Sequence, residues 1–192
     1  MKVTEGKKIY FASDNHLGIP NAKSSLIREK KFVKWLDTIK VDAHSIYLLG
    51  DLFDFWFEYK TVVPKGFTRV LGKIAEIADS GIPIYFFTGN HDMWVRDYFQ
   101  SELGVKVITK PQQFEINEKS FFIGHGDGLG PGDTSYKLMK KFVTNNRLFK
   151  WLVRWVHPDI GVWLGQFLSK EKKIMSAKKD IGAVSYTHLT LP

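Results

Sequence analysis

Four short apolar runs in the first two thirds of the chain each end in polar residues of the kinds that bind metal ions. The runs are residues 9–12, 46–49, 84–87 and 121–123. Buried strands of a mainly parallel sheet read as such apolar runs. Ligands of open α/β sheets sit outside the carboxyl ends of the strands. We therefore expect four strands to deliver their polar residues to one edge of one sheet.

Between these runs the apolar residues have helical spacing. One segment begins at Ser24 or Ser25, either of which can cap it, and runs to about Lys40. Another spans residues 67–78 and ends before Gly81. Successive polar groups are separated by roughly 30 or more residues, the length of one βαβ unit. The sequence therefore predicts an α/β fold.

The polar residues that follow the four runs are Asp, His and Asn, and the chain contains no cysteine. They are Asp14, His16, Asp51, Asp54, Asn90, His91, Asp92 and His125. Singly, each has an ordinary explanation: His91 could be a turn histidine, and Asp92 could cap a following helix. Their joint placement after four strands indicates a metal site. Without thiolates its ligands are oxygen and imidazole, which suit manganese, iron, zinc or magnesium.

Taken in order, these residues resemble the calcineurin-like metallophosphoesterases. That family's pattern is Asp-x-His, Gly-Asp-x-x-Asp, Gly-Asn-His-Asp or Glu, and a later Gly-His. The chain has Asp14-Asn15-His16, Gly50-Asp51-Leu52-Phe53-Asp54, Gly89-Asn90-His91-Asp92 and Gly124-His125 at these places. The resemblance implies an α/β sandwich of two mixed sheets flanked by helices, with a helical insertion. It also implies phosphoester hydrolysis with two divalent metal ions, and Mn²⁺ is the expected ion.

The resemblance implies how the metal ligands are shared. Asp14 and His16 would hold one ion. Asn90 and His125 would hold the second. Asp51 would bridge the two ions, because one carboxylate can contact both. Asp54 would be an orienting neighbour or simply a loop carboxylate.

The resemblance also implies the groups that meet the substrate. His91 would stabilise the transition state or protonate the leaving group, with Asp92 orienting it. Asn90, His91, Asp133 and Ser169 would contact the substrate. Within the family, the chain is most similar to members that cleave the pyrophosphate of a lipid-linked nucleotide sugar in lipid A biosynthesis.

Residues 133–180 differ in character from the core formed by residues 1–132. Most of the formal net charge of +8 falls there, together with three of the six Trp. We expect a helical insertion that lies over the ligand edge, lines a groove for acyl chains and meets an anionic inner-membrane surface. An ordinary amphipathic helical pair with a solvated basic face is the alternative.

The chain shows no secretory signal and no stretch long enough to span a bilayer. We therefore expect a cytoplasmic protein, peripheral on the inner membrane. The expected partners are the lipid-linked substrate and that membrane surface. We expect no nucleic acid and infer no protein partner.

The end of the sequence departs from the family pattern. A final Gly-His-x-His is missing from the 192 residues, and residues 183–192 resemble translated adapter sequence more than the end of a domain. We expect the last strands to be missing, one imidazole to be missing from each metal, and activity to be very low. Two further interpretations stay open: another metallophosphoesterase acting on nucleotides or nucleic acid, and an inactive truncated fragment that binds lipid.

Overall fold

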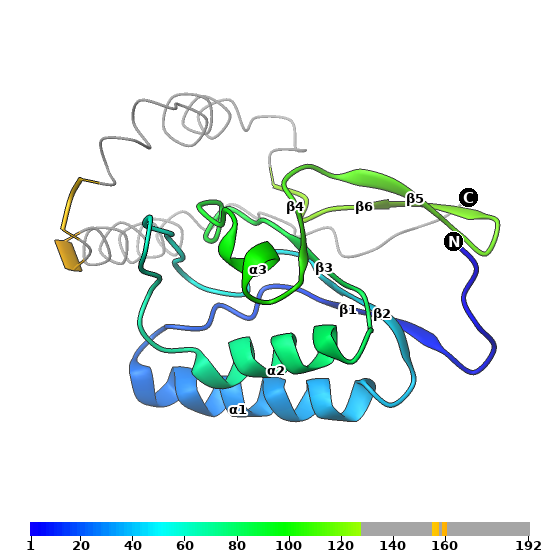
Figure 1. Ribbon diagram of the computed structural model, residues 1–192, viewed down its shortest axis with the longest axis horizontal. Coiled ribbons are helices and arrows are strands. Elements are labelled where there is room, and N and C mark those ends of the chain that lie inside the picture. The colour runs from blue at the N-terminus through cyan, green and yellow to red at the C-terminus, as the bar shows by residue number, and fades with distance from the viewer. Residues whose placement is uncertain (128–154, 158, 161–192) are drawn as a thin grey trace, which may run out of the picture.

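Strands and helices alternate as far as residue 108 in the computed structural model, which describes residues 1–127, 155–157 and 159–160 (Figure 1). The elements are β1 (Lys8–Ala12), α1 (Ala22–Ile39), β2 (Ala43–Leu48), α2 (Thr68–Asp79), β3 (Ile84–Phe87), α3 (Tyr98–Ser101), β4 (Lys106–Ile108), β5 (Gln112–Ile116) and β6 (Lys119–Ile123). This order confirms the predicted α/β class. The sequence pattern missed β4 because its three residues include an exposed lysine and make no apolar run.

Four of the strands form one parallel sheet in the order β1-β2-β3-β4. Tyr10 of β1 lies opposite Ile46 of β2, and Ile46 lies opposite Ile84 of β3. Because these strands are parallel, their carboxyl ends open at the same edge of the sheet. The loops after β1, β2 and β3 therefore start side by side, as expected.

The fourth apolar run lies in a different sheet from the one we expected. β5 and β6 form a two-stranded antiparallel hairpin. Its turn residues Asn117 and Glu118 both have left-handed backbones, with φ of 47° and 65°, as in the tight turns that join twisted strands. A short apolar run fits a buried parallel strand and a hairpin strand equally well, so the pattern alone could not assign the sheet.

Helices α1 and α2 lie together on one face of the parallel sheet (Figure 1). Leu36 of α1 and Ile74 of α2 meet Ile46 and Phe86 of the sheet, and all four side chains are fully buried. Burying a side chain of this kind contributes about 1.5–3 kcal/mol. This core fixes the strands whose ends carry the polar residues.

The hairpin packs on the same sheet through a second apolar cluster. Tyr47 and Phe87 of the sheet meet Ile116 and Ile123 of the hairpin. Tyr47 also stacks on Tyr85, with ring centroids 4.6 Å apart. The parallel sheet is thus packed against helices and against a second, smaller sheet, in agreement with the expected sandwich.

The cap of α1 differs from the one we expected. Asn21 is the N-cap, and its side chain accepts the Ser24 N–H at 2.9 Å. Ser25 instead accepts the N–H of Gly18 at 2.7 Å and so holds the preceding loop. Asn and Ser are equally good N-caps, so sequence alone could not choose among them.

Helix α2 has its cap supplied by the neighbouring helix. Phe67 stands at its N-cap and offers no side-chain acceptor. Glu29 of α1 is buried, and its Oε1 accepts the N–H groups of Arg69 and Val70 at 3.0 and 3.2 Å. A carboxylate at a helix N-terminus satisfies orphan donors and complements the helix dipole.

The expected helical insertion at residues 133–180 and the tail at 183–192 lie outside the described residues, apart from 155–157 and 159–160. Within the part of the chain that the structure describes, no helix combines the length and apolar character needed to cross a membrane.

Candidate metal centre

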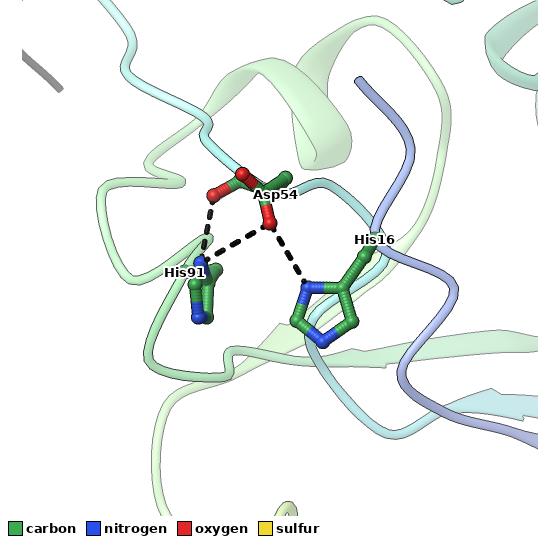
Figure 2. A group of neighbouring side chains, drawn as sticks. All are labelled: His16, Asp54 and His91. Atoms are coloured by element: carbon green, nitrogen blue, oxygen red, sulfur yellow. Dashed lines mark hydrogen bonds and ion pairs between the residues drawn. The ribbon is translucent and has the colours of Figure 1, made fainter. Parts of the chain in front are cut away.

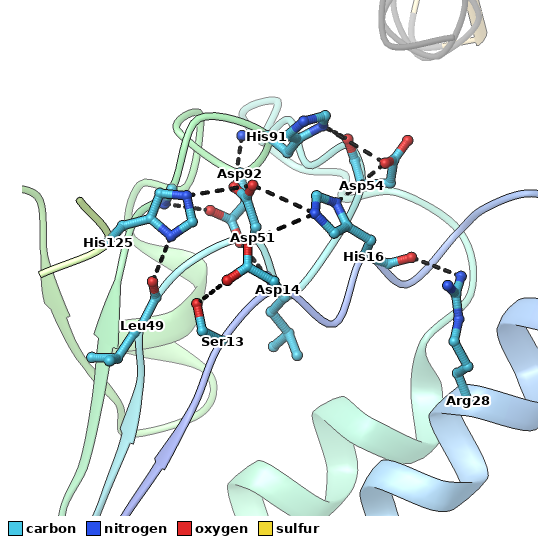
Figure 3. A network of polar contacts seen from close by, with 12 residues as sticks. Ser13, Asp14, His16, Arg28, Leu49, Asp51, Asp54, His91, Asp92 and His125 are labelled. Atoms are coloured by element: carbon cyan, nitrogen blue, oxygen red, sulfur yellow. Dashed lines mark hydrogen bonds and ion pairs between the residues drawn. The ribbon is translucent and has the colours of Figure 1, made fainter. Parts of the chain in front are cut away.

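Four loops bring their acidic and histidine side chains to one place (Figure 3). Asp14 and His16 follow β1, Asp51 follows β2, His91 follows β3, and His125 follows β6. The candidate ligand atoms of Asp14, His16 and Asp51 lie within 4.8 Å of one another. Residues far apart in the sequence are therefore brought close enough to share a metal site.

The loop backbones are held in an unusual conformation at this place. Asp14, His16 and Asp51 have left-handed φ values of 56°, 43° and 53°. Side-chain-bearing residues seldom adopt this region, and they persist there when the surroundings hold them. Here the Asp14 N–H donates to the Gly50 carbonyl at 3.2 Å, and the His16 N–H donates to the Asp51 carbonyl at 2.9 Å.

Arg28 of α1 supports the same loop from the helix side. Its guanidinium donates to the His16 carbonyl at 2.9 Å and also to the Ile19 carbonyl (Figure 3). Because one planar guanidinium donates to both carbonyls, the loop has little freedom to move. The first helix therefore positions His16.

Two glycines allow the loops after β2 and β3 to touch. A β-carbon on Gly50 would come within 2.7 Å of the Gly89 nitrogen, and Gly50 has a φ of +91°. A β-carbon on Gly89 would collide with the Asp51 carboxylate. The glycines of the Gly-Asp and Gly-Asn-His-Asp motifs are thus explained by close approach.

Asp51 lies at the middle of the cluster and is only 3% exposed. Its Oδ1 accepts the His91 N–H at 2.9 Å. Its Oδ2 lies 3.4 Å from His125 Nε2 and 3.7 Å from His16 Nε2. Burial would raise the pKa of Asp51, but the contacts with His125 and the His91 N–H outweigh it and hold the pKa below its usual value.

His125 is oriented by a backbone carbonyl. Its Nδ1 lies 2.7 Å from the Leu49 carbonyl, to which it donates, so Nε2 is the nitrogen that faces Asp51. Metal-binding histidines commonly donate their other ring N–H to a carbonyl in this way. Burial lowers the pKa of His125, but the Asp51 carboxylate more than compensates and raises it to about 9.

A second cluster joins His16, Asp54 and His91 (Figure 2). Oδ1 of the buried Asp54 lies 3.3 Å from His16 Nδ1 and 3.7 Å from His91 Nδ1. The Asp54 carbonyl accepts from His91 Nδ1 at 2.8 Å. Asp54 therefore orients both rings, and Nε2 of each histidine is the nitrogen turned away from it.

Asp92 has backbone partners that we did not expect. Its carboxylate accepts the Gly89 N–H at 2.7 Å and the Leu52 N–H at 2.9 Å. Asp54 contacts the His91 ring. Asp92 holds the two loop backbones together, and its orienting role toward His91 stays a prediction. Asp92 is completely buried, and burial followed by the charge of Asp51 raises its pKa to about 7.

The other expected site residues are placed less fully. Asn90 is half-buried between Gly89 and His91 in the loop after β3. Asp133 and Ser169 lie outside the described residues. Sequence reasoning missed the Leu49 carbonyl and Arg28 as supports, because a backbone acceptor and a helix arginine carry no motif.

The donor set fits divalent cations. Imidazole nitrogens and carboxylate oxygens face one another at distances that a shared ion would close. Asp14, Asp51, Asp54 and Asp92 also bring four carboxyl groups to this edge of the sheet, and the charge of Asp51 adds to burial in raising the pKa of Asp92. Cations would relieve this repulsion, and oxygen with imidazole is a ligand set for hard or borderline metals.

Comparison with known proteins agrees with this geometry. The calcineurin-like phosphoesterase family matches residues 7–185, and the chain belongs to that family. Membership implies divalent metal ions as cofactors, consistent with the His and Asp groups at the sheet edge.

Several relatives are named UDP-2,3-diacylglucosamine hydrolase. The Porphyromonas gingivalis protein is 40% identical over 183 residues, which are 94% of this chain and 70% of that protein. A Histophilus somni protein is 28% identical over 91% of this chain and 72% of its own length. A Haemophilus influenzae protein is 30% identical over 77% of this chain and 59% of its own length.

Proposed function

We propose that this chain hydrolyses the pyrophosphate of UDP-2,3-diacylglucosamine to UMP and 2,3-diacylglucosamine 1-phosphate, a step of lipid A biosynthesis. The observation that carries the proposal is the 40% identity, over 94% of the chain, to a relative named for hydrolysis of this compound. The cluster around Asp51 supports it, because pyrophosphate hydrolysis needs a site that collects cations beside oriented imidazoles.

Five residues are the proposed metal ligands. Asp14 and His16 would bind one ion, and Asn90 and His125 the other. Asp51 would bridge them, a role supported by the approach of its Oδ2 to both imidazoles. Mn²⁺ is the proposed ion, since carboxylate, amide oxygen and imidazole suit it. Divalent ions bound here would polarise the phosphoryl oxygens and lower the pKa of a bound water.

The protein's own part in the reaction lies with His91. Water adds to the α-phosphorus, and the bond from that phosphorus to the bridging oxygen breaks, so the oxygen leaves with the sugar phosphate. The Asp54 carbonyl fixes a proton on Nδ1 of His91 and leaves Nε2 to meet the substrate. In its protonated form His91 would donate from Nε2 to the phosphoryl or leaving oxygen.

The expected insertion is the proposed binding region for the lipid part of the substrate. Residues 133–180 would act as a lid, with Asp133 and Ser169 contacting the sugar-lipid. The excess of Lys and Arg in residues 133–180 would attract this segment to the anionic surface on the cytoplasmic face of the inner membrane. The support is charge and composition alone.

The test is a single-turnover assay with the protein in excess over UDP-2,3-diacylglucosamine and with Mn²⁺ present, which detects slow hydrolysis. We expect UMP to form, EDTA to stop it, and His125→Gln to reduce the rate at least about tenfold. His44→Gln, a half-buried histidine away from the cluster, is the matched control and should change little. Cleavage of UDP-N-acetylglucosamine or of single-stranded DNA in preference to the lipid substrate would contradict the proposal.

A further inference from the structure

A cavity of about 1070 Å³ opens beside the metal centre. Its walls come from the loop between β1 and α1, the first turns of α1, the loop between β2 and α2 with the start of α2, and the residues His157 and Asp159 (Figure 1). Asp54 lines this cavity and also contacts His16 and His91. The cavity is therefore adjacent to the proposed reacting groups, with Asp54 between them.

Aromatic side chains make part of the cavity wall. Phe55, Tyr59 and Phe67 line it. Tyr59 is packed against Phe57 with ring centroids 4.7 Å apart, and Phe67 is packed against Phe53 at the same distance. These rings are therefore held in place by the core beneath them. Fixed aromatic faces are surfaces on which a nucleobase can stack.

Polar and cationic groups lie on the same wall. Lys65 and Arg69 line the cavity, and neither side chain has an ion pair within the described part of the chain. The Tyr59 hydroxyl is buried without a hydrogen-bond partner among the described residues. Burial, and then Asp159, raise the pKa of Tyr59, so its hydroxyl remains a donor. Asn21 uses its Oδ1 on the α1 cap, which leaves its amide nitrogen for another acceptor.

These groups distinguish two possible occupants. An acyl chain would leave the buried Tyr59 hydroxyl without a hydrogen-bond partner. It would also gain nothing from Lys65 and Arg69. A pyrimidine nucleoside brings a flat ring, carbonyl oxygens and ribose hydroxyls, and it comes attached to phosphate. The cavity wall is therefore chemically complementary to a pyrimidine nucleotide and not to an acyl chain.

We propose that this cavity receives the uridine of the substrate, with the base against the aromatic wall and its polar edge toward Tyr59. The inference rests on the proposed function, in which the phosphate of UMP lies at the metal centre. It assigns the nucleotide half of the substrate to the core loops and leaves the lipid half on the other side of the reacting phosphorus.

The test measures binding and so does not depend on turnover. Val62 lines the cavity and is 45% exposed, so Val62→Trp would fill space without disturbing the core. Val41, which is 76% exposed and does not line the cavity, gives the matched control Val41→Trp. Dissociation constants for UMP, inorganic phosphate and dodecyl phosphate would be measured by calorimetry on the full chain with Mn²⁺.

We expect Val62→Trp to weaken UMP binding at least about tenfold and to leave inorganic phosphate unchanged, because only the nucleoside enters the cavity. Tyr59→Phe should weaken UMP about fivefold, the worth of one hydrogen bond, with no loss of thermal stability. Val41→Trp should match the parent chain for all three ligands.

Two results would overturn the assignment. If Val62→Trp weakens dodecyl phosphate and spares UMP, the cavity is an acyl site. If it changes neither ligand, the cavity is no subsite. Failure of the proposed function is a separate outcome, because a chain that does not hydrolyse the lipid substrate can still lose UMP affinity on Val62→Trp.

Discussion

Metal binding should become much tighter between pH 7 and pH 8, because His125, one of the proposed ligands, must lose a proton first. The Asp51 carboxylate raises the pKa of His125 to about 9 in the metal-free protein. The neutral, metal-binding form is then about 1% of the total at pH 7 and about 9% at pH 8. The apparent affinity should rise about ninefold over that interval, whereas an ordinary histidine of pKa about 6.5 would give only about 1.3-fold.

Calorimetric titration of the EDTA-treated, dialysed chain with Mn²⁺ would measure this dependence. Buffers with different ionisation enthalpies would report the protons released, close to one from His125 at pH 7. His125→Gln should bind more weakly and lose the pH dependence, and His44→Gln should retain both. An affinity that does not change from pH 7 to pH 8, or a dependence that survives in His125→Gln, would refute the reasoning.

The same pKa predicts how the stability of the metal-free chain varies with pH. A histidine whose folded pKa is raised contributes stability that is complete below its unfolded pKa and is lost as pH rises through the folded value. Between pH 6.5 and pH 9 the loss from His125 should be on the order of 3 kcal/mol. Urea unfolding in EDTA at these two pH values would measure it.

Three substitutions test the packing of the site. Glu29→Ala should destabilise the chain by about 1–3 kcal/mol in urea unfolding, because two N–H groups of α2 lose their acceptor, whereas Ala at the exposed Glu5 should change little. Asp92→Ala should cost about 2–5 kcal/mol by the same assay, since it leaves two loop N–H groups buried and unpaired; a cost under about 1 kcal/mol would contradict its structural role. Gly89→Ala should weaken Mn²⁺ binding at least about tenfold, because the new methyl group meets the Asp51 carboxylate. Gly72→Ala, on the open face of α2, should instead stabilise the fold by about 0.5–1 kcal/mol and leave Mn²⁺ binding unchanged.

The strands that carry the site could be predicted because each is a buried apolar run followed by polar loop residues. Periodicity does not report pairing direction, so the sheet to which β6 belongs was predicted wrongly. The sequence prediction considered only Ser24 and Ser25 as caps, but Asn21 lies within the same five residues and is chemically alike in this role. Only the folded backbone shows that Asn21 caps α1 and that Ser25 holds the loop.

Some residues of the candidate site could be predicted from the sequence and others could not. Residue type and spacing were enough to select Asp14, His16, Asp51 and His125, which the fold brings together. The groups that orient them include the carbonyls of Leu49 and Asp54, and every residue has a carbonyl. The partners of Asp92 also include backbone N–H groups, those of Leu52 and Gly89, which no motif predicts.

The origin of His125 in the hairpin has a consequence for how the molecule is assembled. The parallel sheet contributes three of the converging residues and the hairpin contributes the fourth. An ion held by both would act as a cross-link between the two layers, so any motion that lifts the hairpin from Tyr47 and Phe87 must also break a coordination bond. During synthesis the hairpin leaves the ribosome after the first three strands, so the metal centre would be completed only when that late layer docks.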